Sequence, residues 1–143
     1  MMRWLWVALL GTFLFLSIRA ALDGIWVMAA VYLLIGLVAS WRLSPWKGGR
    51  TIRHQEVLAM AEEDRRVVIY WRPGCGYCAR LRSTLGQAAD RATWVNIWQD
   101  EDAAAFVRSV NDGNEVVPTV VIDGVALTNP PPAVVKERIE TLA

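Results

Sequence analysis

The N-terminal part of the chain contains two uncharged, apolar runs, at residues 4–18 and 24–41, and these strongly constrain how it can fold. A helix needs roughly 17–25 apolar residues to span a bilayer, so the second run is long enough. The first run is shorter, but Arg3 and Arg19 at its ends can extend their charged groups toward the lipid headgroups. We therefore predict a transmembrane helical hairpin over residues 1–43.

The basic residues that flank these runs predict the orientation of the hairpin. Arg3 precedes the first run, and the second is followed by Arg42, Lys47, Arg50 and Arg53 with no acid among them. The turn between the runs carries one arginine and one aspartate. Because short loops rich in Lys and Arg stay in the cytoplasm, we expect a two-pass protein of the cell membrane whose remaining domain is cytoplasmic.

A cleaved signal peptide that ends near Ala21 is the alternative interpretation of the first run. The lengths of its charged and apolar regions fit, but residues 17–21 make a poor small-x-small cleavage site. A second apolar run also follows at once, which favours the hairpin.

The rest of the chain divides into a linker, residues 44–53, and a domain, residues 54–143. Proline and paired glycines within 45–49 break the preceding helix. Hydrophobic periodicity then alternates between strand and helix patterns, which indicates an α/β domain. The first predicted elements are a helix over 54–64, a strand over 67–71, a helix over 77–89, a strand over 94–98 and a helix capped by Asp100. Strands over 119–122 and 125–127 follow, joined by an Asp123-Gly124 turn. In the final helix, Asn129 is the predicted cap, Pro130 the first residue, and Val135, Ile139 and Leu142 the apolar face.

Both cysteines of the chain lie in one short motif, Cys75-Gly76-Tyr77-Cys78. The motif follows an apolar strand and a Pro73-Gly74 bend, so Cys75 falls at the N-terminus of a helix, where free N–H groups and the helix dipole favour the thiolate. Such placement lowers a cysteine pKa from about 8.5 into the range of roughly 3.5–7.5. Because only the thiolate attacks disulfides, we predict Cys75 as the nucleophile and Cys78, one turn inward, as the resolving thiol. Arg72 either adds positive charge beside the pair or is an ordinary exposed residue at the strand end.

The sequence gives little support for a metal site, a structural disulfide or a nucleic-acid-binding surface. A structural zinc site needs four ligands, and only Cys75, Cys78 and His54 are obvious candidates, so we expect no metal and place His54 on the surface of a helix. A structural disulfide with this short spacing at a helix start is strained and reducible, which favours a working disulfide. The net charge of +1, without a stripe of Lys and Arg, argues against nucleic-acid binding.

Val117-Pro118-Thr119 is the second feature that bears on chemistry. A proline that opens an apolar strand cannot donate to the sheet, which suits a backbone that stays open to a visiting chain. A turn of this kind beside the cysteines could contain a cis peptide bond. Taken alone, a proline before a strand is also an ordinary structural feature.

Together, these features make residues 67–142 resemble the glutaredoxin family. The resemblance depends on the Cys-x-x-Cys motif after an apolar strand, on Val117-Pro118-Thr119, and on the Asp123-Gly124 hairpin that Leu127-Thr128-Asn129-Pro130 closes. Within that family the pattern is most similar to the mycoredoxins of actinobacteria. The shared segments are Cys-Gly-Tyr-Cys, Ala-Ala-Ala-Phe-Val at 103–107, Ser-Val-Asn at 109–111 and Leu-Thr-Asn-Pro at 127–130.

The resemblance implies a thioredoxin fold with a groove that binds a low-molecular-weight thiol. Val117 and Pro118, cis in the family, would dock that thiol, and Thr128 and Asn129 would line the same groove. The full set of candidate thiol-binding residues is Arg72, Tyr77, Val117, Pro118, Thr128 and Asn129. Relatives that use glutathione carry Gly-Gly and then an acid near this point, whereas residues 128–132 contain no acid. Neutral hydrogen-bonding groups suit a sugar-type thiol, so mycothiol is favoured over glutathione.

The sequence therefore predicts a membrane-anchored thiol–disulfide oxidoreductase without a tightly bound cofactor. Its partners would be the bilayer, a low-molecular-weight thiol, and proteins that form mixed disulfides with that thiol. Two alternatives remain open. One is an outward-facing oxidant for secreted proteins, and the other is an iron–sulfur cluster carrier that uses Cys75.

Overall fold

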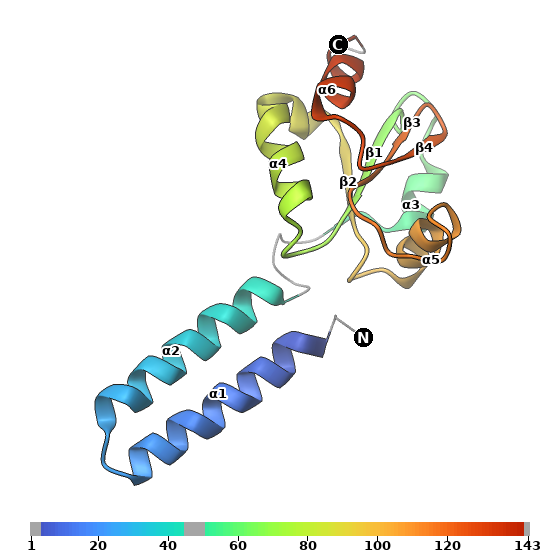
Figure 1. Cartoon of the computed structure of the whole chain (residues 1–143). Coiled ribbons are helices and arrows are strands. Elements are labelled where there is room, and N and C mark those ends of the chain that lie inside the picture. The colour runs from blue at the N-terminus through green and yellow to red at the C-terminus, as the bar shows by residue number, and fades with distance from the viewer. Residues whose placement is uncertain (1–3, 45–50, 142–143) are drawn as a thin grey trace. The chain divides into compact units, whose positions relative to one another are not determined.

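A computed structural model describes residues 4–44 and 51–141 of the chain (Figure 1). The chain divides into two compact units, Met1–Lys47 and Gly48–Ala143. Several residues named above fall outside the described ranges, namely Arg3, Lys47, Arg50, the proline and glycines of 45–49, and Leu142.

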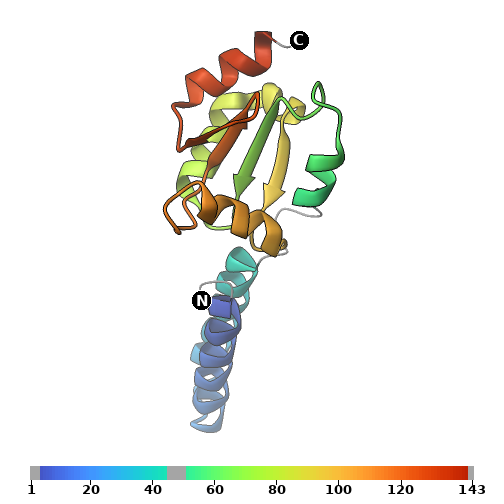
Figure 2. The same ribbon diagram turned by 90° about the vertical axis from the view of Figure 1, so that its right-hand side faces the viewer.

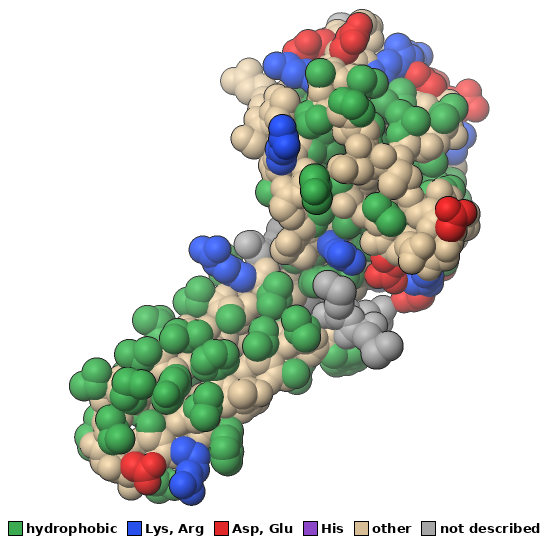
Figure 3. All heavy atoms as spheres, viewed as in Figure 1, with side chains coloured by type: hydrophobic (Ala, Val, Ile, Leu, Met, Phe, Trp, Pro, Cys, Tyr) green, Lys and Arg blue, Asp and Glu red, His purple; other side chains and the backbone are tan. Residues whose placement is uncertain are grey.

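The first unit is a pair of helices, α1 (Leu5–Leu22) and α2 (Trp26–Leu43). Each helix has 18 residues and is long and apolar enough to cross a membrane, a test that a signal sequence near the N-terminus also passes. Figure 3 shows hydrophobic side chains over the visible face of this hairpin. Both helices extend beyond the predicted spans at their C-terminal ends, because Arg19 and Arg42 are good helix formers and continue the last turns.

Small residues let the two helices of the hairpin pack closely. The buried residues of α2 are Ala29, Gly36 and Ser40. A Cβ atom added at Gly36 would lie 2.5 Å from the Cβ of Phe13, so only glycine fits at this contact. The hydroxyl of Ser40 donates to the Trp6 carbonyl at 2.9 Å, and that of Ser17 donates to the Ala29 carbonyl at 2.8 Å. Small residues and hydroxyl–carbonyl bonds of this kind hold helices together in apolar surroundings.

The second unit is built on a four-stranded sheet with the order β2-β1-β3-β4. The central strand β1 (Val67–Trp71) pairs in parallel with β2 (Thr93–Asn96) and antiparallel with β3 (Thr119–Ile122). The edge strand β4 (Val125–Thr128) pairs antiparallel with β3. Asp123-Gly124 joins these two strands with φ angles of 48° and 83°, the left-handed conformation that a tight hairpin turn needs.

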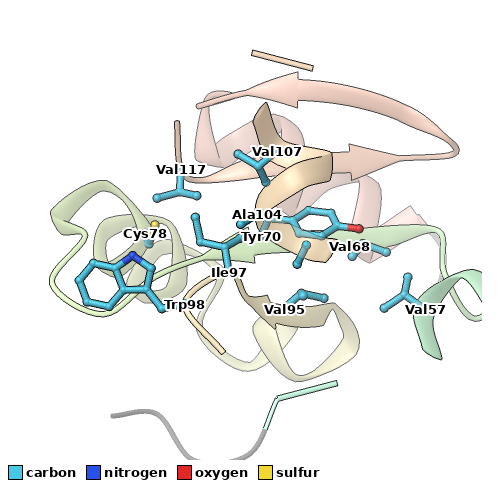
Figure 4. Close-up of a cluster of buried hydrophobic side chains, with 11 residues drawn as sticks. Val57, Val68, Tyr70, Cys78, Val95, Ile97, Trp98, Ala104, Val107 and Val117 are labelled. Atoms are coloured by element: carbon cyan, nitrogen blue, oxygen red, sulfur yellow. The ribbon is translucent and has the colours of Figure 1, made fainter. Parts of the chain in front are cut away.

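Helices cover both faces of this sheet (Figure 2). Helices α4 (Gly76–Leu85) and α6 (Pro132–Thr141) pack on one face, and α3 (His54–Ala59) and α5 (Glu101–Ser109) pack on the other. Side chains of β1 alternate between the two cores, since Val67 and Ile69 join the α4/α6 cluster while Val68 and Tyr70 join the other. Figure 4 shows the second cluster, with Val57 at one end and Cys78 and Trp98 at the other.

Residues just before α3 also contact the sheet. The Thr51 hydroxyl donates to the Trp94 carbonyl at 3.0 Å and accepts from the Asn96 N–H at 2.9 Å. The side chain therefore pairs with backbone groups along the outer edge of β2, which is an edge strand of the described sheet. Part of the predicted linker thus binds the second unit.

Strands β1 and β3 and the helix after Asp100 agree with the sequence prediction, but several boundaries differ. The helix predicted over 77–89 ends at Leu85, because Gly86 adopts a φ of 54°, and a 3-10 helix over Gly86–Arg91 follows. The strand predicted over 94–98 ends at Asn96, whose side-chain oxygen accepts the Trp98 N–H and forms a turn. The helix predicted over 54–64 ends at Ala59.

The predicted start of the last helix is wrong. Asn129 has a φ of 45°, and its N–H donates to the Pro118 carbonyl at 2.8 Å rather than opening a helix. Helix α6 begins at Pro132, two residues later than a cap at Asn129 requires. The contact with Pro118, which is distant in sequence, takes Asn129 out of the helix.

Candidate active site

The turn after β1 places Cys75 at the start of α4. The turn passes through Gly74, whose φ of 77° lies in the left-handed region that favours glycine. Cys75 follows as the N-cap residue, with an extended backbone. The strand, the bend and the helix therefore put its sulfur where the N–H groups of the first helical turn have no partners within the helix.

Cys75 and Cys78 are joined by a disulfide, but their environments differ. The Cys78 N–H points at the Cys75 sulfur, with 3.1 Å between nitrogen and Sγ. Cys75 is half-buried, whereas Cys78 is 3 % exposed and belongs to the core. Only Cys75 is therefore both accessible and bonded to a helix N–H, which favours a thiolate at that sulfur once the bond is reduced.

The loop before β3 forms the other side of the site. The Val117–Pro118 peptide bond is cis, as the resemblance to glutaredoxins implied. The Val117 carbonyl oxygen lies 3.4 Å from the Cys75 sulfur, and Figure 4 shows the Val117 and Cys78 side chains at the same end of the core. The Pro118 side chain is fully buried. Any ligand at this loop would therefore meet the backbone of Val117 and the exposed neighbour Val116 rather than the proline ring.

Thr128 and Asn129 lie beside this loop. Thr128 pairs with Thr119 across the β3–β4 ladder, and the Asn129 N–H donates to the Pro118 carbonyl. Both residues are exposed. The Thr128 hydroxyl is already engaged as a donor to Oδ1 of Asn111, a residue to which the sequence assigned no role. The only signal for Asn111 was its place in the Ser-Val-Asn segment of the family pattern.

Arg72 and Tyr77, the other two candidate thiol-binding residues, lie near the cysteines in sequence and outside the core. The Arg72 guanidinium lies 5.9 Å from the centre of the Trp98 ring, near the outer limit of a cation–π contact. The Tyr77 side chain, on the first turn of α4, is 64 % exposed. Both side chains are free to contact a bound molecule, and neither is part of the core.

The expectation that His54 lies on the surface is wrong. His54 is 8 % exposed, its Nδ1 lies 2.8 Å from the Tyr70 hydroxyl, and its ring stacks on Phe106 at 5.0 Å. Burial, together with the negative charge of Asp100, raises the pKa of Tyr70. His54 thus belongs to a buried polar pair in the core, and the described residues contain no cluster of three His, Cys, Asp or Glu that could hold a metal.

Comparison with known proteins agrees with this geometry. The glutaredoxin family model matches residues 67–127. Mycoredoxin 1 of Corynebacterium glutamicum is 47% identical over 79 residues, which cover 54% of this chain and 96% of that protein. A putative glutaredoxin of Mycobacterium tuberculosis is 44% identical over 80 residues, covering 54% of this chain and 93% of that protein. No solved structure matches the chain.

These matches cover nearly the whole length of the relatives, and the mixed sheet with helices on both faces is the thioredoxin fold that the resemblance implied. Helices α1 and α2 and the segment through α3 lie outside the residues that the family model matches. The chain belongs to the glutaredoxin family, is similar to mycoredoxins in its second unit, and is a thiol–disulfide oxidoreductase.

Proposed function

We propose that this chain is a membrane-anchored oxidoreductase that reduces mixed disulfides between proteins and mycothiol, with Cys75 as the nucleophile. The observation that carries this proposal is the asymmetry of the cysteine pair. The half-buried Cys75 accepts the Cys78 N–H at 3.1 Å, while Cys78 is 3 % exposed. A bulky protein disulfide can therefore reach Cys75 and cannot reach Cys78.

The proposed reaction begins with the Cys75 thiolate. It attacks the mycothiol sulfur of the mixed disulfide, so that a Cys75–mycothiol bond forms and the protein sulfur leaves as a thiolate, which takes a proton from water. The N–H of Cys78 stabilises the charge on Cys75 before attack. The Val117 carbonyl, 3.4 Å from the sulfur, lies where the incoming chain would dock.

Two routes can then clear Cys75. In the first, the thiolate of a second mycothiol attacks the mycothiol sulfur, which releases the disulfide of two mycothiols and restores the Cys75 thiolate. In the second, the Cys78 thiolate attacks the Cys75 sulfur, which releases mycothiol and forms the Cys75–Cys78 disulfide present in the structure. Two further mycothiols would reduce that bond and leave as their disulfide.

The choice of mycothiol over glutathione is supported by the chemistry of the loop after β4. Residues 128–132 offer a hydroxyl and an amide but no carboxylate to pair with the charged amine of glutathione. The Thr128 hydroxyl donates its hydrogen to Asn111, so its oxygen remains an acceptor for a sugar hydroxyl. The similarity to mycoredoxin 1 points the same way.

The membrane anchor is supported by the first unit. No described residue of α1 is buried, and in α2 only Ala29, Gly36 and Ser40 are, so the two helices differ from the buried core helices of a soluble domain. An exposed apolar surface of this size needs a cover, and lipid is the cover that the helix lengths fit. Arg42 and Arg53 after the hairpin favour a cytoplasmic catalytic unit. Extraction of membranes at high pH, and labelling of intact cells with an impermeant thiol reagent, test these two points.

The activity is tested by turnover of a protein–mycothiol mixed disulfide. Cys75→Ser is expected to abolish turnover, and Cys78→Ser to retain part of it if the first clearing route operates. Replacement of mycothiol by glutathione in the same mixed disulfide is expected to lower kcat/KM. Full activity of Cys75→Ser would refute the mechanism, and equal kcat/KM values for the two thiols would refute the preference.

A further inference from the structure

Asn111 follows α5 and is buried, although nothing in the exchange reaction requires an amide there. Its Nδ2 donates to the Val107 carbonyl at 2.7 Å and to the Thr119 hydroxyl oxygen at 3.0 Å. Its Oδ1 accepts from the Thr128 hydroxyl. One side chain, 8 % exposed, therefore joins α5, β3 and β4 and uses both of its donor hydrogens and its acceptor.

These bonds surround the loop that faces Cys75. The Thr119 hydroxyl, which accepts from Asn111, donates in turn to the Val116 carbonyl at 2.8 Å. On the other side, the Asn129 N–H donates to the Pro118 carbonyl at 2.8 Å. The network therefore fixes the backbone on both sides of Val117.

We propose that Asn111 is a positioning residue for thiol–disulfide exchange. Its amide holds the segment 116–119 and Thr128 so that the Val117 backbone stays 3.4 Å from the Cys75 sulfur. This inference rests on the proposed docking of the mixed disulfide at Val117. Asn111 makes no hydrogen bond to α4, so it acts on the order of the docking loop and leaves the reactivity of Cys75 unchanged.

The consequence is a specific kinetic signature. Without the amide, the loop samples other conformations, and the docking-competent one is only a fraction of the total. The apparent affinity for the mixed disulfide falls by that fraction, while the chemical step at Cys75 is unaffected. We expect Asn111→Ala to raise KM for a protein–mycothiol mixed disulfide by roughly tenfold, equivalent to about 1.4 kcal/mol, with kcat and the alkylation rate of Cys75 unchanged.

Asn114→Ala is the matched control. Asn114 lies in the same turn and is exposed, and its amide bonds only to the Asn111 and Asp112 carbonyls, each at 3.3 Å. Its side chain makes no hydrogen bond to the described residues 116–119 or to Thr128, so its replacement is expected to leave KM unchanged. A rise in KM that is equal in both variants would overturn the proposal, because it would reflect a general loosening of the turn.

Amide hydrogen exchange gives a readout that needs no substrate. Loosening of the loop is expected to speed exchange at the Asn129 N–H, which bonds to Pro118, and to leave the Cys78 N–H unchanged. If the wild-type chain fails to turn over the mycothiol substrate, the proposed function fails, while exchange in Asn111→Ala still decides the role of Asn111. A lower melting temperature with unchanged KM and unchanged Asn129 exchange would show a purely structural role and overturn the proposal.

A second pair of variants covers the case in which Asn111→Ala does not fold. Thr128→Val removes one donor to the Asn111 amide at an exposed position, and Thr128→Ser restores it. We expect faster Asn129 exchange in Thr128→Val and wild-type exchange in Thr128→Ser. Equal exchange in both variants would overturn the proposal.

Discussion

Replacement of Cys78 by proline removes the thiol and the backbone N–H of this residue, and comparison with Cys78→Ala isolates the effect of the N–H. The Cys78 N–H is the group that donates to the Cys75 sulfur at 3.1 Å, and proline has no N–H. Cys78 is the third residue of α4, where the N–H has no partner within the helix and a proline ring meets no carbonyl of a preceding helical turn. The change therefore tests the hydrogen bond, provided that Tyr77, the residue before the proline, keeps its helical conformation.

The size of the effect follows from the strength of the bond. A hydrogen bond to a charged group contributes about 1.5–3 kcal/mol, and 1.36 kcal/mol corresponds to one pH unit in a titration. The pH midpoint of Cys75 alkylation is therefore expected to lie about one to two units higher in Cys78→Pro. The comparison is made with Cys78→Ala, which also lacks the second thiol but keeps the N–H.

The assay is the rate of Cys75 alkylation as a function of pH, since each variant contains one cysteine. Circular dichroism of both variants checks that α4 remains folded. Identical midpoints in two folded variants would refute the idea that the Cys78 N–H stabilises the thiolate. The contribution of α4 to the charge on Cys75 would then come from the helix dipole and the other N–H groups of its first turn.

Three further predictions address the pH dependence, the stability and the anchor. Because burial and Asp100 raise the pKa of Tyr70, the contribution of this residue to stability is complete below about pH 10 and is lost as pH rises through the folded-state pKa. Chemical unfolding at a series of pH values is expected to show this alkaline loss in the wild type and not in Tyr70→Phe. Equal dependence of the unfolding free energy on pH in the two proteins would contradict the prediction. Thr51→Val is expected to lower the free energy of unfolding by about 1–2 kcal/mol, because two backbone groups of β2 lose their hydrogen bonds to the Thr51 hydroxyl. The control Thr84→Val removes only an exposed hydrogen bond within α4. An equal decrease in unfolding free energy in both variants would refute a specific role for Thr51. Deletion of residues 1–44 is expected to move the protein from the membrane to the soluble fraction, and continued membrane association would show that the hairpin is not the anchor.

The elements that the sequence predicted best are those defined by local chemistry. The apolar strand Val67–Trp71 and the Asp123-Gly124 turn have the observed boundaries because residue type alone determines them. The position of Cys75 at a helix start likewise followed from the proline and glycine before it. Local pattern was therefore sufficient to place Cys75 at a helix start, whereas the role of the Val117 loop was expected only from the resemblance to glutaredoxins.

The boundary errors at Gly86 and Asn96 have local causes, whereas the errors at His54 and Asn129 concern residues whose partners are distant in sequence. His54 looked like a surface residue because the helical pattern does not reveal Tyr70 and Phe106, which bury its ring. Asn129 looked like a helix cap because its bond to Pro118 forms only when the sheet assembles. Asn111 received no role for the same reason, since the sheet brings Thr119 and Thr128 to it. Long-range polar pairs of this kind have no signature in periodicity.

The most direct test of the mechanism is to identify which sulfur Cys75 captures. Reduced Cys78→Ser is incubated with a protein–mycothiol mixed disulfide, and the intact mass of the chain is measured before a second thiol is added. We predict the mass of one added mycothiol, located at Cys75, with release of the free protein thiol. An adduct with the substrate protein in place of mycothiol, or a chain without any adduct, would contradict the account.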